Sequence, residues 1–267
     1  MGSENHYALP SSPTNRCVDR FSITVDTEED ENGQIPFWAL LSELLFGDIT
    51  SPETLIDLLE TISVTTHDSS GLAGDYGTLR KFLASRPKFF QTQWPTLVKI
   101  ALSMPQLFPG NTLPVLERDR AANSVQLSRK QVGCLVIHQF LGTLKAPSWK
   151  DDGLHDFAAW YGNEQRHLQA VSAYLESLFS YFDKLVTFSG DSEASGEDSP
   201  VCYALRDSSS IRAGIFNNVS NETVPLSELT VRIVERYSTD PSALGLPHGA
   251  CVVSANRFVG FGQSATQ

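Results

Sequence analysis

The hydrophobic pattern of this 267-residue chain changes its period part-way along the sequence. Up to about residue 188 the apolar residues recur at helical spacing, whereas beyond residue 211 they alternate or form short β-branched runs, as strands do. Between these parts the chain reads SGDSEASGEDSP, a composition typical of a linker. We therefore expect a helical domain over 36–188, an acidic Ser/Gly-rich linker over 189–210, and the start of an α/β unit over 211–267.

Four helices of the first unit carry strong signals. The segment 36–47 carries an apolar stripe and ends at Gly47, and the next helix begins with Ser51 as N-cap and Pro52 at its first position. Two longer amphipathic helices follow at about 126–143 and 165–187, and we expect them to pack together because their stripes have nowhere else to be buried. The predicted stripes are Val132, Leu135, Val136, Gln139, Phe140 and Thr143 in one, and Leu168, Val171, Tyr174, Leu175, Leu178, Phe179 and Phe182 in the other.

The remaining segments of the first unit carry weaker signals. Residues 1–35 are polar and aperiodic, and we expect a disordered or extended tail with one extended piece, RFSITVD. A short helix is predicted around Leu97–Met104. An extended segment should follow it, because Pro105, Pro109 and Pro114 forbid a continuing helix.

Composition excludes several classes of function. A net charge of −11 argues against a general nucleic-acid binder, and we expect no direct DNA binding. No window approaches the length of apolar sequence that spans a membrane, and the six histidines share no metal-ligand spacing, so we expect no membrane, metal or cofactor. The four cysteines lie far apart, and no signal peptide is recognisable, which together favour a reducing, intracellular location, nuclear and/or cytoplasmic.

Four stretches, in this order, resemble the poly(ADP-ribose) glycohydrolase family. The first is FFQTQWPTLVKIALSMPQLFPGNTLPVL, which resembles the segment leading into the family's accessory helical domain. The second is LSRKQVGCLVIHQFLGTL, which matches the family's L-S-x-x-Q-x-x-x-L-x-x-x-x-F-x-x-T helix at Leu127, Ser128, Gln131, Leu135, Phe140 and Thr143. The third, FAAWY…YLESLFSYFDKLV, resembles the helix that packs this domain onto a macrodomain. The fourth, SANRFVGFGQSATQ, resembles the signature that begins A-N-x-x-V-G-G-G and ends Q-E-E.

The resemblance implies a fold and a set of binding residues. The fold would be α+β/α/β, a helical accessory domain followed by the first strands of a macrodomain that grips ADP-ribose. Asn256 would bind the ribose beside the scissile bond, and Gly260, Phe261 and Gly262 would form the loop around the diphosphate. Gln267 would precede the catalytic glutamate pair, so no catalytic residue is expected within 1–267. The partner would be poly(ADP-ribose) or ADP-ribose, bound by a monomer.

Other interpretations of these residues stay open. Asn256 could equally close a strand and cap a turn, and Gly260 and Gly262 could form a plain turn. The chain also departs from the family pattern at Phe261, which replaces the second of three glycines, and at Val253, where many members have an aspartate.

Three functional hypotheses follow. The first is a poly(ADP-ribose) glycohydrolase of which this chain is the N-terminal portion, inactive by itself. The second is a catalytically inactive macrodomain relative or a helical interaction module. The third is an unrelated helical protein with a chance match.

Overall fold

The structure, a computed structural model, describes residues 6–24, 27–66, 76–116, 124–144, 168–190 and 200–204. Its helices are α1 (Phe37–Phe46), α2 (Pro52–Thr66), α3 (Gly77–Ala84), α4 (Phe89–Thr92), α5 (Trp94–Leu102), α6 (Met104–Leu107), α7 (Arg129–Phe140) and α9 (Leu168–Gly190). Its strands are β1 (His6–Ala8), β2 (Arg16–Cys17), β3 (Ile35–Pro36), β4 (Thr112–Pro114), β5 (Ser124–Leu127) and β6 (Val201–Ala204). The strands predicted beyond residue 211 lie outside the described residues.

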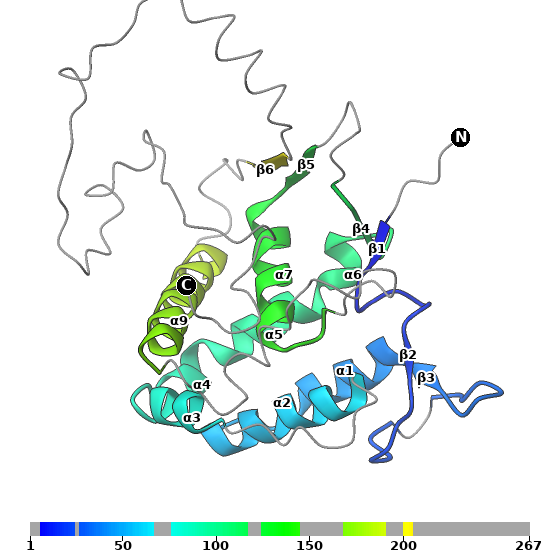
Figure 1. The fold of residues 1–267 in the computed structure, drawn as a ribbon, viewed down its shortest axis with the longest axis horizontal. Helices are drawn as coiled ribbons and strands as arrows, with labels where there is room; N and C mark the ends of the chain where they lie inside the picture. Colours follow the sequence, from blue (N-terminus) through cyan, green and yellow to red (C-terminus); the bar gives the residue numbers. More distant parts are fainter. Residues whose placement is uncertain are drawn as a thin grey trace, which may run out of the picture.

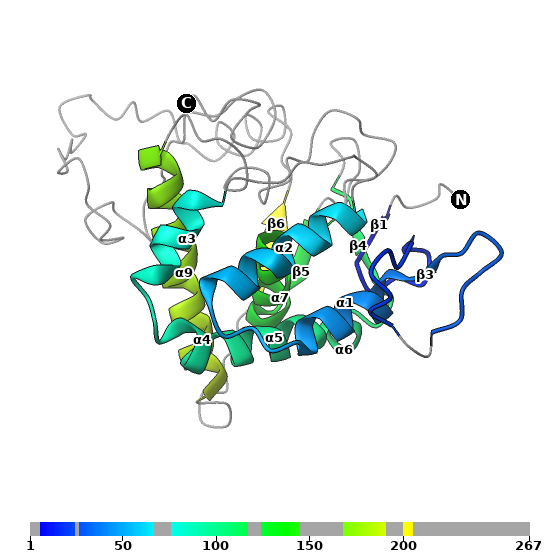
Figure 2. The ribbon, with the colours of Figure 1, turned by 90° about the horizontal axis from the view of Figure 1, so that it is seen from below.

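Helices dominate the described residues, and the strands form three small antiparallel pairs, β1 with β4, β2 with β3 and β5 with β6. Figure 1 shows α3, α4 and α9 at one end of the molecule and the β1–β4 and β2–β3 pairs at the other. Figure 2, turned by 90°, shows α1 and α2 running between these two ends. The described part of the chain is therefore a helical unit with short two-stranded ribbons at its margins.

The structure confirms the two helices predicted near the start. Helix α1 ends at Phe46 with Gly47 as its C-cap. Helix α2 begins at Pro52, and the Ser51 hydroxyl accepts a hydrogen bond from the Thr54 amide at 3.2 Å. The Thr54 hydroxyl in turn accepts one from the Ser51 amide at 3.1 Å. This reciprocal pair satisfies two of the backbone donors that a helix start leaves unpaired.

The two long helices also pack together as predicted, although their ends and one of their faces differ. The Phe140 ring of α7 lies with its centroid 5.8 Å from that of Phe179 and 5.6 Å from that of Phe182, both on α9. The predicted stripe of α9 is buried apart from Leu168, which is 58% exposed, and Tyr174, which is half-buried. On α7 the predicted face is only partly right, because the most buried residues include Gly133, Cys134, Ile137 and His138.

The reason for the altered face is that α7 is enclosed on two sides. Helix α9 packs on one side through its phenylalanines, and α5 and α6 contact the other. A helix with two covered faces has no single apolar stripe, so Val132, Leu135 and Val136 are half-buried while the residues between them are buried. Hydrophobic periodicity predicts a single buried face, so it misses the second buried face of such a helix.

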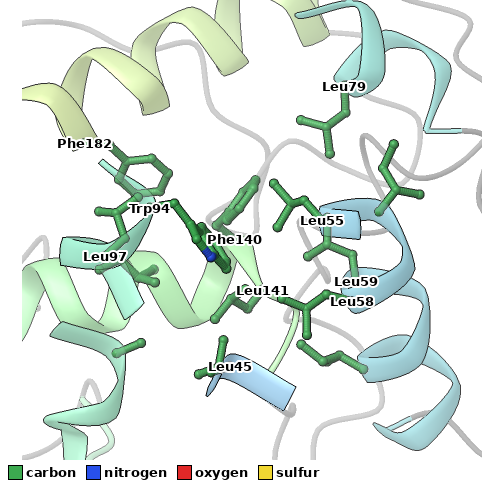
Figure 3. Packing of buried hydrophobic residues seen from close by; sticks show 14 of the residues in the cluster. Leu45, Leu55, Leu58, Leu59, Leu79, Trp94, Leu97, Phe140, Leu141 and Phe182 are labelled. Atoms are coloured by element: carbon green, nitrogen blue, oxygen red, sulfur yellow. The ribbon is translucent and has the colours of Figure 1, made fainter. Parts of the chain in front are cut away.

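The main core joins residues from both ends of the described chain. Figure 3 shows Leu55, Leu58 and Leu59 of α2 on one side of the core and Leu97 of α5 and Phe182 of α9 on the other, with Phe140 of α7 between them. A second, smaller cluster lies under the β1–β4 ribbon and consists of Leu9, Met104, Phe108, Leu127 and Cys134. Helix α7 therefore connects the two clusters, with Cys134 in the smaller one and Ile137 and Phe140 in the main core.

Residues 6–36 make more structure than the expected tail. Leu9 is fully buried, and Cys17 and Ile35 belong to the main core. The extended piece predicted at RFSITVD is wrong for its described residues, 20–24. There the chain turns around Asp19, whose carboxylate accepts hydrogen bonds from the amides of Phe21, Ile23 and Thr24.

The prolines after residue 104 act differently from the prediction. Pro105 does end α5, but it lies in the first turn of a new helix, α6. Proline is tolerated there because the amide hydrogens of a first turn have no partner within the helix. Pro114, by contrast, lies in an extended strand, β4, as expected.

Candidate functional site

The binding residues predicted from the sequence, Asn256, Gly260, Phe261, Gly262 and Gln267, all lie outside the described residues, as does Val253. The described residues instead show what the family-like motif of α7 does and how the chain leaves the helical unit toward residue 205.

The first half of the motif builds the start of α7. Ser128 is the N-cap, and its hydroxyl accepts a hydrogen bond from the Gln131 amide at 3.1 Å. The Gln131 side-chain oxygen accepts from the Ser128 amide at 2.8 Å, which completes a capping box. The side-chain nitrogen of Gln131 donates to the Leu107 carbonyl at 2.8 Å. Gln131 thus caps α7 and ties it to the end of α6.

The second half of the motif finishes the helix. Gly142 has φ +70°, and the Thr143 amide donates to the His138 carbonyl at 3.0 Å, the pattern of a glycine-terminated helix. The Thr143 hydroxyl lies 2.8 Å from Nδ1 of His138, while Nε2 of the same ring lies 3.1 Å from the Ala101 carbonyl of α5. Because that carbonyl can only accept, Nε2 carries the hydrogen and Nδ1 is an acceptor for the Thr143 hydroxyl, whose single hydrogen is shared with the His138 carbonyl at 3.0 Å.

Cys134 and His138 lie one turn apart on α7, a spacing that would suit a thiol nucleophile and its base. Both, however, are directed at the same backbone oxygen, since Cys134 Sγ also lies 3.8 Å from the Ala101 carbonyl. Burial raises the pKa of the Cys134 thiol to about 12 and lowers that of His138 to about 4. Neither a thiolate nor an accessible base is formed near neutral pH, so this pair holds α7 against α5.

The chain leaves the helical unit beside α7 and α9. Strand β6 pairs with β5 in antiparallel register, from Leu127 opposite Val201 to Ser124 opposite Ala204 (Figure 1). Near this ribbon three large apolar side chains are exposed or half-buried, Tyr181 and Phe188 of α9 and Tyr203 of β6. The Arg129 guanidinium lies 5.8 Å from the centre of the Phe188 ring. This surface is the one from which the chain continues.

A second contact holds α9, between Asp183 and the Gln93 side chain at the start of α5, and the sequence does not predict it. The Asp183 carboxylate accepts a hydrogen bond from the Gln93 side chain and lies 3.6 Å from the Arg86 guanidinium. That guanidinium also lies 4.7 Å from the centre of the Phe82 ring. The sequence separation of 90 residues between Gln93 and Asp183 gives no local pattern, so no single-sequence signal could have found this contact.

Other kinds of site are not seen in the part of the chain that the structure describes. It contains no group of three or more His, Cys, Asp or Glu side chains placed to bind a metal ion. In the same residues, no helix combines the length and the apolar composition that a bilayer span requires.

Much of the helical unit resembles a known family. Residues 83–200 match the family model described as the helical domain of poly(ADP-ribose) glycohydrolase. The match confirms the resemblance to that family over these residues. A search of curated proteins found no match to the chain.

The family match covers less than half of the chain, and it includes the α7 motif described above. It includes the capping box at Ser128, the buried His138–Thr143 contact and the Asp183 contact on α9. It starts within α3, yet its core is completed by α1 and α2, which lie upstream of the match. The matched residues therefore fold together with residues that the family model does not describe.

Proposed function

We propose that this chain is the N-terminal portion of a poly(ADP-ribose) glycohydrolase, which hydrolyses ribose–ribose O-glycosidic bonds of the polymer and releases ADP-ribose. The observation that carries the proposal is the match of residues 83–200 to the helical domain of that family. The order of the segments supports it, because the signature-like stretch SANRFVGFGQSATQ follows the helical domain, as the resemblance requires.

In this proposal the helical domain is a scaffold. Its polar motif residues are engaged in capping and in holding helices together, with Ser128 at a helix start and His138 fully buried. The chemistry is then assigned to the macrodomain that residues 211–267 begin. The exposed aromatic side chains of Phe188 and Tyr203 give that macrodomain an apolar surface to cover.

The proposed chemistry needs three contributions. Asn256 would hold the ribose next to the scissile bond, and Gly260 and Gly262 would let backbone amides approach the diphosphate because no Cβ stands in the way. The leaving oxygen must also receive a proton from a carboxylic acid as the oxocarbenium-like transition state forms. Residues 249–267 contain no Asp or Glu, so the acid would be a glutamate after Gln267.

The test is ADP-ribose release from purified poly(ADP-ribose). Residues 1–267 should give no turnover, because a general acid is worth about 10²–10⁴-fold and the rest of the site is needed for positioning. Protein extended by the natural downstream sequence should release ADP-ribose, and replacing its first two glutamates by glutamine should abolish release while sparing binding. Turnover by 1–267 alone would contradict the assignment of the acid.

The second candidate is a catalytically inactive relative that binds ADP-ribose, or a helical interaction module. Two departures from the family pattern favour it, Phe261 in the glycine loop and Val253 where many members have an aspartate. An extended protein that binds ADP-ribose without releasing it from polymer would support this candidate. Restoring turnover with Phe261→Gly would assign the defect to the loop.

A further inference from the structure

The charges of this chain are strongly segregated. The whole sequence has 31 acidic and 20 basic residues, yet residues 76–116 contain no Asp or Glu at all. The same segment carries Arg80, Lys81, Arg86, Lys88 and Lys99. It forms α3, α4, α5, α6 and β4, so the basic segment makes up much of the helical unit's frame.

Two of these lysines lie on one exposed stripe. Helices α4 and α5 follow each other almost without a break, because Gln93 between them keeps a helical conformation and its carbonyl accepts from the amides of Thr96 and Leu97. Along this path Lys88 and Lys99 are eleven residues apart, which is close to three full turns and about 16 Å. The stripe, hereafter the Lys88–Lys99 stripe, consists of exposed Lys88, Thr92, Pro95 and Lys99.

The opposite side of the same helices is buried, which fixes how the stripe is presented. Phe89, Trp94 and Leu97 are 2%, 4% and 1% exposed and belong to the main core. The helices therefore cannot rotate the lysines inward without exposing these side chains.

Acidic side chains form ion pairs with the two arginines of the segment. Arg86 pairs with Asp183 at 3.6 Å, and Arg80 lies 3.8 Å from Glu53. Among the residues that the structure describes, no acidic group forms an ion pair with Lys88 or Lys99. Their charges are available to an external anion.

We propose that the Lys88–Lys99 stripe binds poly(ADP-ribose) outside the catalytic pocket. The inference rests on the proposed function, since the polymer is the ligand that this function supplies. Poly(ADP-ribose) carries two phosphates in every repeat, so residues 1–267, with a net charge of −11, repel it at a distance. A basic stripe on the helical domain offsets that repulsion. It holds one part of the polymer while another part, an end or an interior segment, occupies the macrodomain.

Binding of residues 1–267 to purified, fluorescently labelled poly(ADP-ribose), measured by anisotropy over a range of salt concentrations, tests this inference. The variant Lys88→Gln/Lys99→Gln should bind roughly tenfold more weakly at 0.1 M salt, and its plot of log Kd against log salt should be shallower by about 1.5. The matched control Lys130→Gln/Lys184→Gln removes two exposed lysines from α7 and α9 and the same total charge. It should leave the affinity within about twofold of the parent.

Equal losses in the two variants, or no loss in either, would overturn the proposal, as would an unmodified protein that does not bind the polymer. Single-stranded DNA with the same number of phosphates tests the source of the anion. Equal affinity for DNA, with the same loss in the variant, would make the stripe a general phosphate surface and would overturn its assignment to poly(ADP-ribose).

Failure of the stripe and failure of the proposed function give different results. Because the binding experiment needs no turnover, stripe-dependent binding by 1–267 together with an inactive extended protein would reject only the glycohydrolase. Release of ADP-ribose by the extended protein, without any effect of the lysine variant on polymer binding, would reject only the stripe.

Discussion

Gly133 of α7 lies directly under Leu185 of α9, with no room between them for a larger residue. A Cβ placed on Gly133 would be 2.7 Å from Cδ1 and 2.9 Å from Cδ2 of Leu185, closer than carbon atoms approach in folded proteins. Glycine in the middle of a helix normally weakens it by roughly 1 kcal/mol relative to alanine. Here that cost is offset by the close approach of α7 and α9.

Gly133→Ala should therefore destabilise the protein even though alanine favours the helix. The Leu185 side chain must move within a packed core, and overpacking of this kind costs about 1–3 kcal/mol. We expect a net loss of about 1 kcal/mol after the gain in helix propensity, measured as a lower urea midpoint by circular dichroism.

Two further variants make this prediction specific. In Gly133→Ala/Leu185→Ala the second change removes the obstructing side chain, so the double variant should be more stable than the sum of the single losses predicts. Gly110→Ala is the matched control, because the new Cβ would lie 3.6 Å from the Thr112 hydroxyl, an ordinary contact. Additive losses, or an equal loss in Gly110→Ala, would show that Leu185 is not the cause.

The relationship between Gly133 and Leu185 also shows what sequence could and could not predict. The existence of α7 and α9 follows from their periodicity, and their ends lie within about three residues of the prediction. The start of α7 was placed too early because residues 124–127 pair with β6, a contact across more than 70 residues. The buried side of α7 was misjudged because Gly133 and His138 carry no apolar signal of their own.

His138 should make stability depend on pH between about 4 and 6.5. Burial lowers its pKa in the folded protein to about 4 from the ordinary value of 6.5. Between these values the unfolded chain binds a proton that the folded protein rejects, so stability falls as the pH is lowered. The stability that neutral, buried His138 allows should be fully present above pH 6.5. On reaching pH 4 the free energy of unfolding should have fallen by about 3 kcal/mol.

Urea unfolding at pH 7, 6, 5 and 4 measures this dependence. His138→Gln keeps a side-chain N–H that can donate to the Ala101 carbonyl but does not titrate, so its midpoint should change much less over the same range. Asp19 and Asp30 do not confuse the result. Hydrogen bonds from backbone amides contribute to lowering their pKa values below 3.8, and their own contribution is lost only at lower pH. An unchanged pH dependence in His138→Gln would contradict the assignment.

Asp183 should contribute to stability mainly through Gln93. The Asp183–Arg86 ion pair is partly exposed and is screened by solvent, whereas Asp183 accepts a hydrogen bond from the Gln93 side chain at the start of α5. Asp183→Ala removes both, and we expect a loss of about 1 kcal/mol in urea unfolding. Glu176→Ala, an exposed acid two turns earlier on α9, is the control and should stay within about 0.5 kcal/mol.

The binding residues expected after residue 250 illustrate a different limit of sequence reasoning. Asn256 and Gly260 were assigned by their place in a short signature, and that assignment remains a prediction because their positions are outside the described residues. The α7 motif was also recognised by resemblance, but its physical content became visible only in three dimensions. Gln131 contacts Leu107 across 24 residues, which no local spacing rule encodes.

Gln131→Glu separates the two roles of that residue. Glutamate serves as well as glutamine in a capping box, and a negative charge in the first turn of a helix is favourable by about 0.3–1 kcal/mol. If capping were all that mattered, the variant would be neutral or more stable.

Glutamate cannot donate to the Leu107 carbonyl, however, so two acceptors would face each other at the contact that now measures 2.8 Å. We therefore expect a loss of about 1 kcal/mol in urea unfolding, the lower end of the cost of an unpaired acceptor, because the contact is only partly buried. Gln126→Glu adds the same charge at an exposed position of β5 and should change the midpoint little. A stability of Gln131→Glu equal to or above that of the parent would show that the link between α6 and α7 contributes nothing.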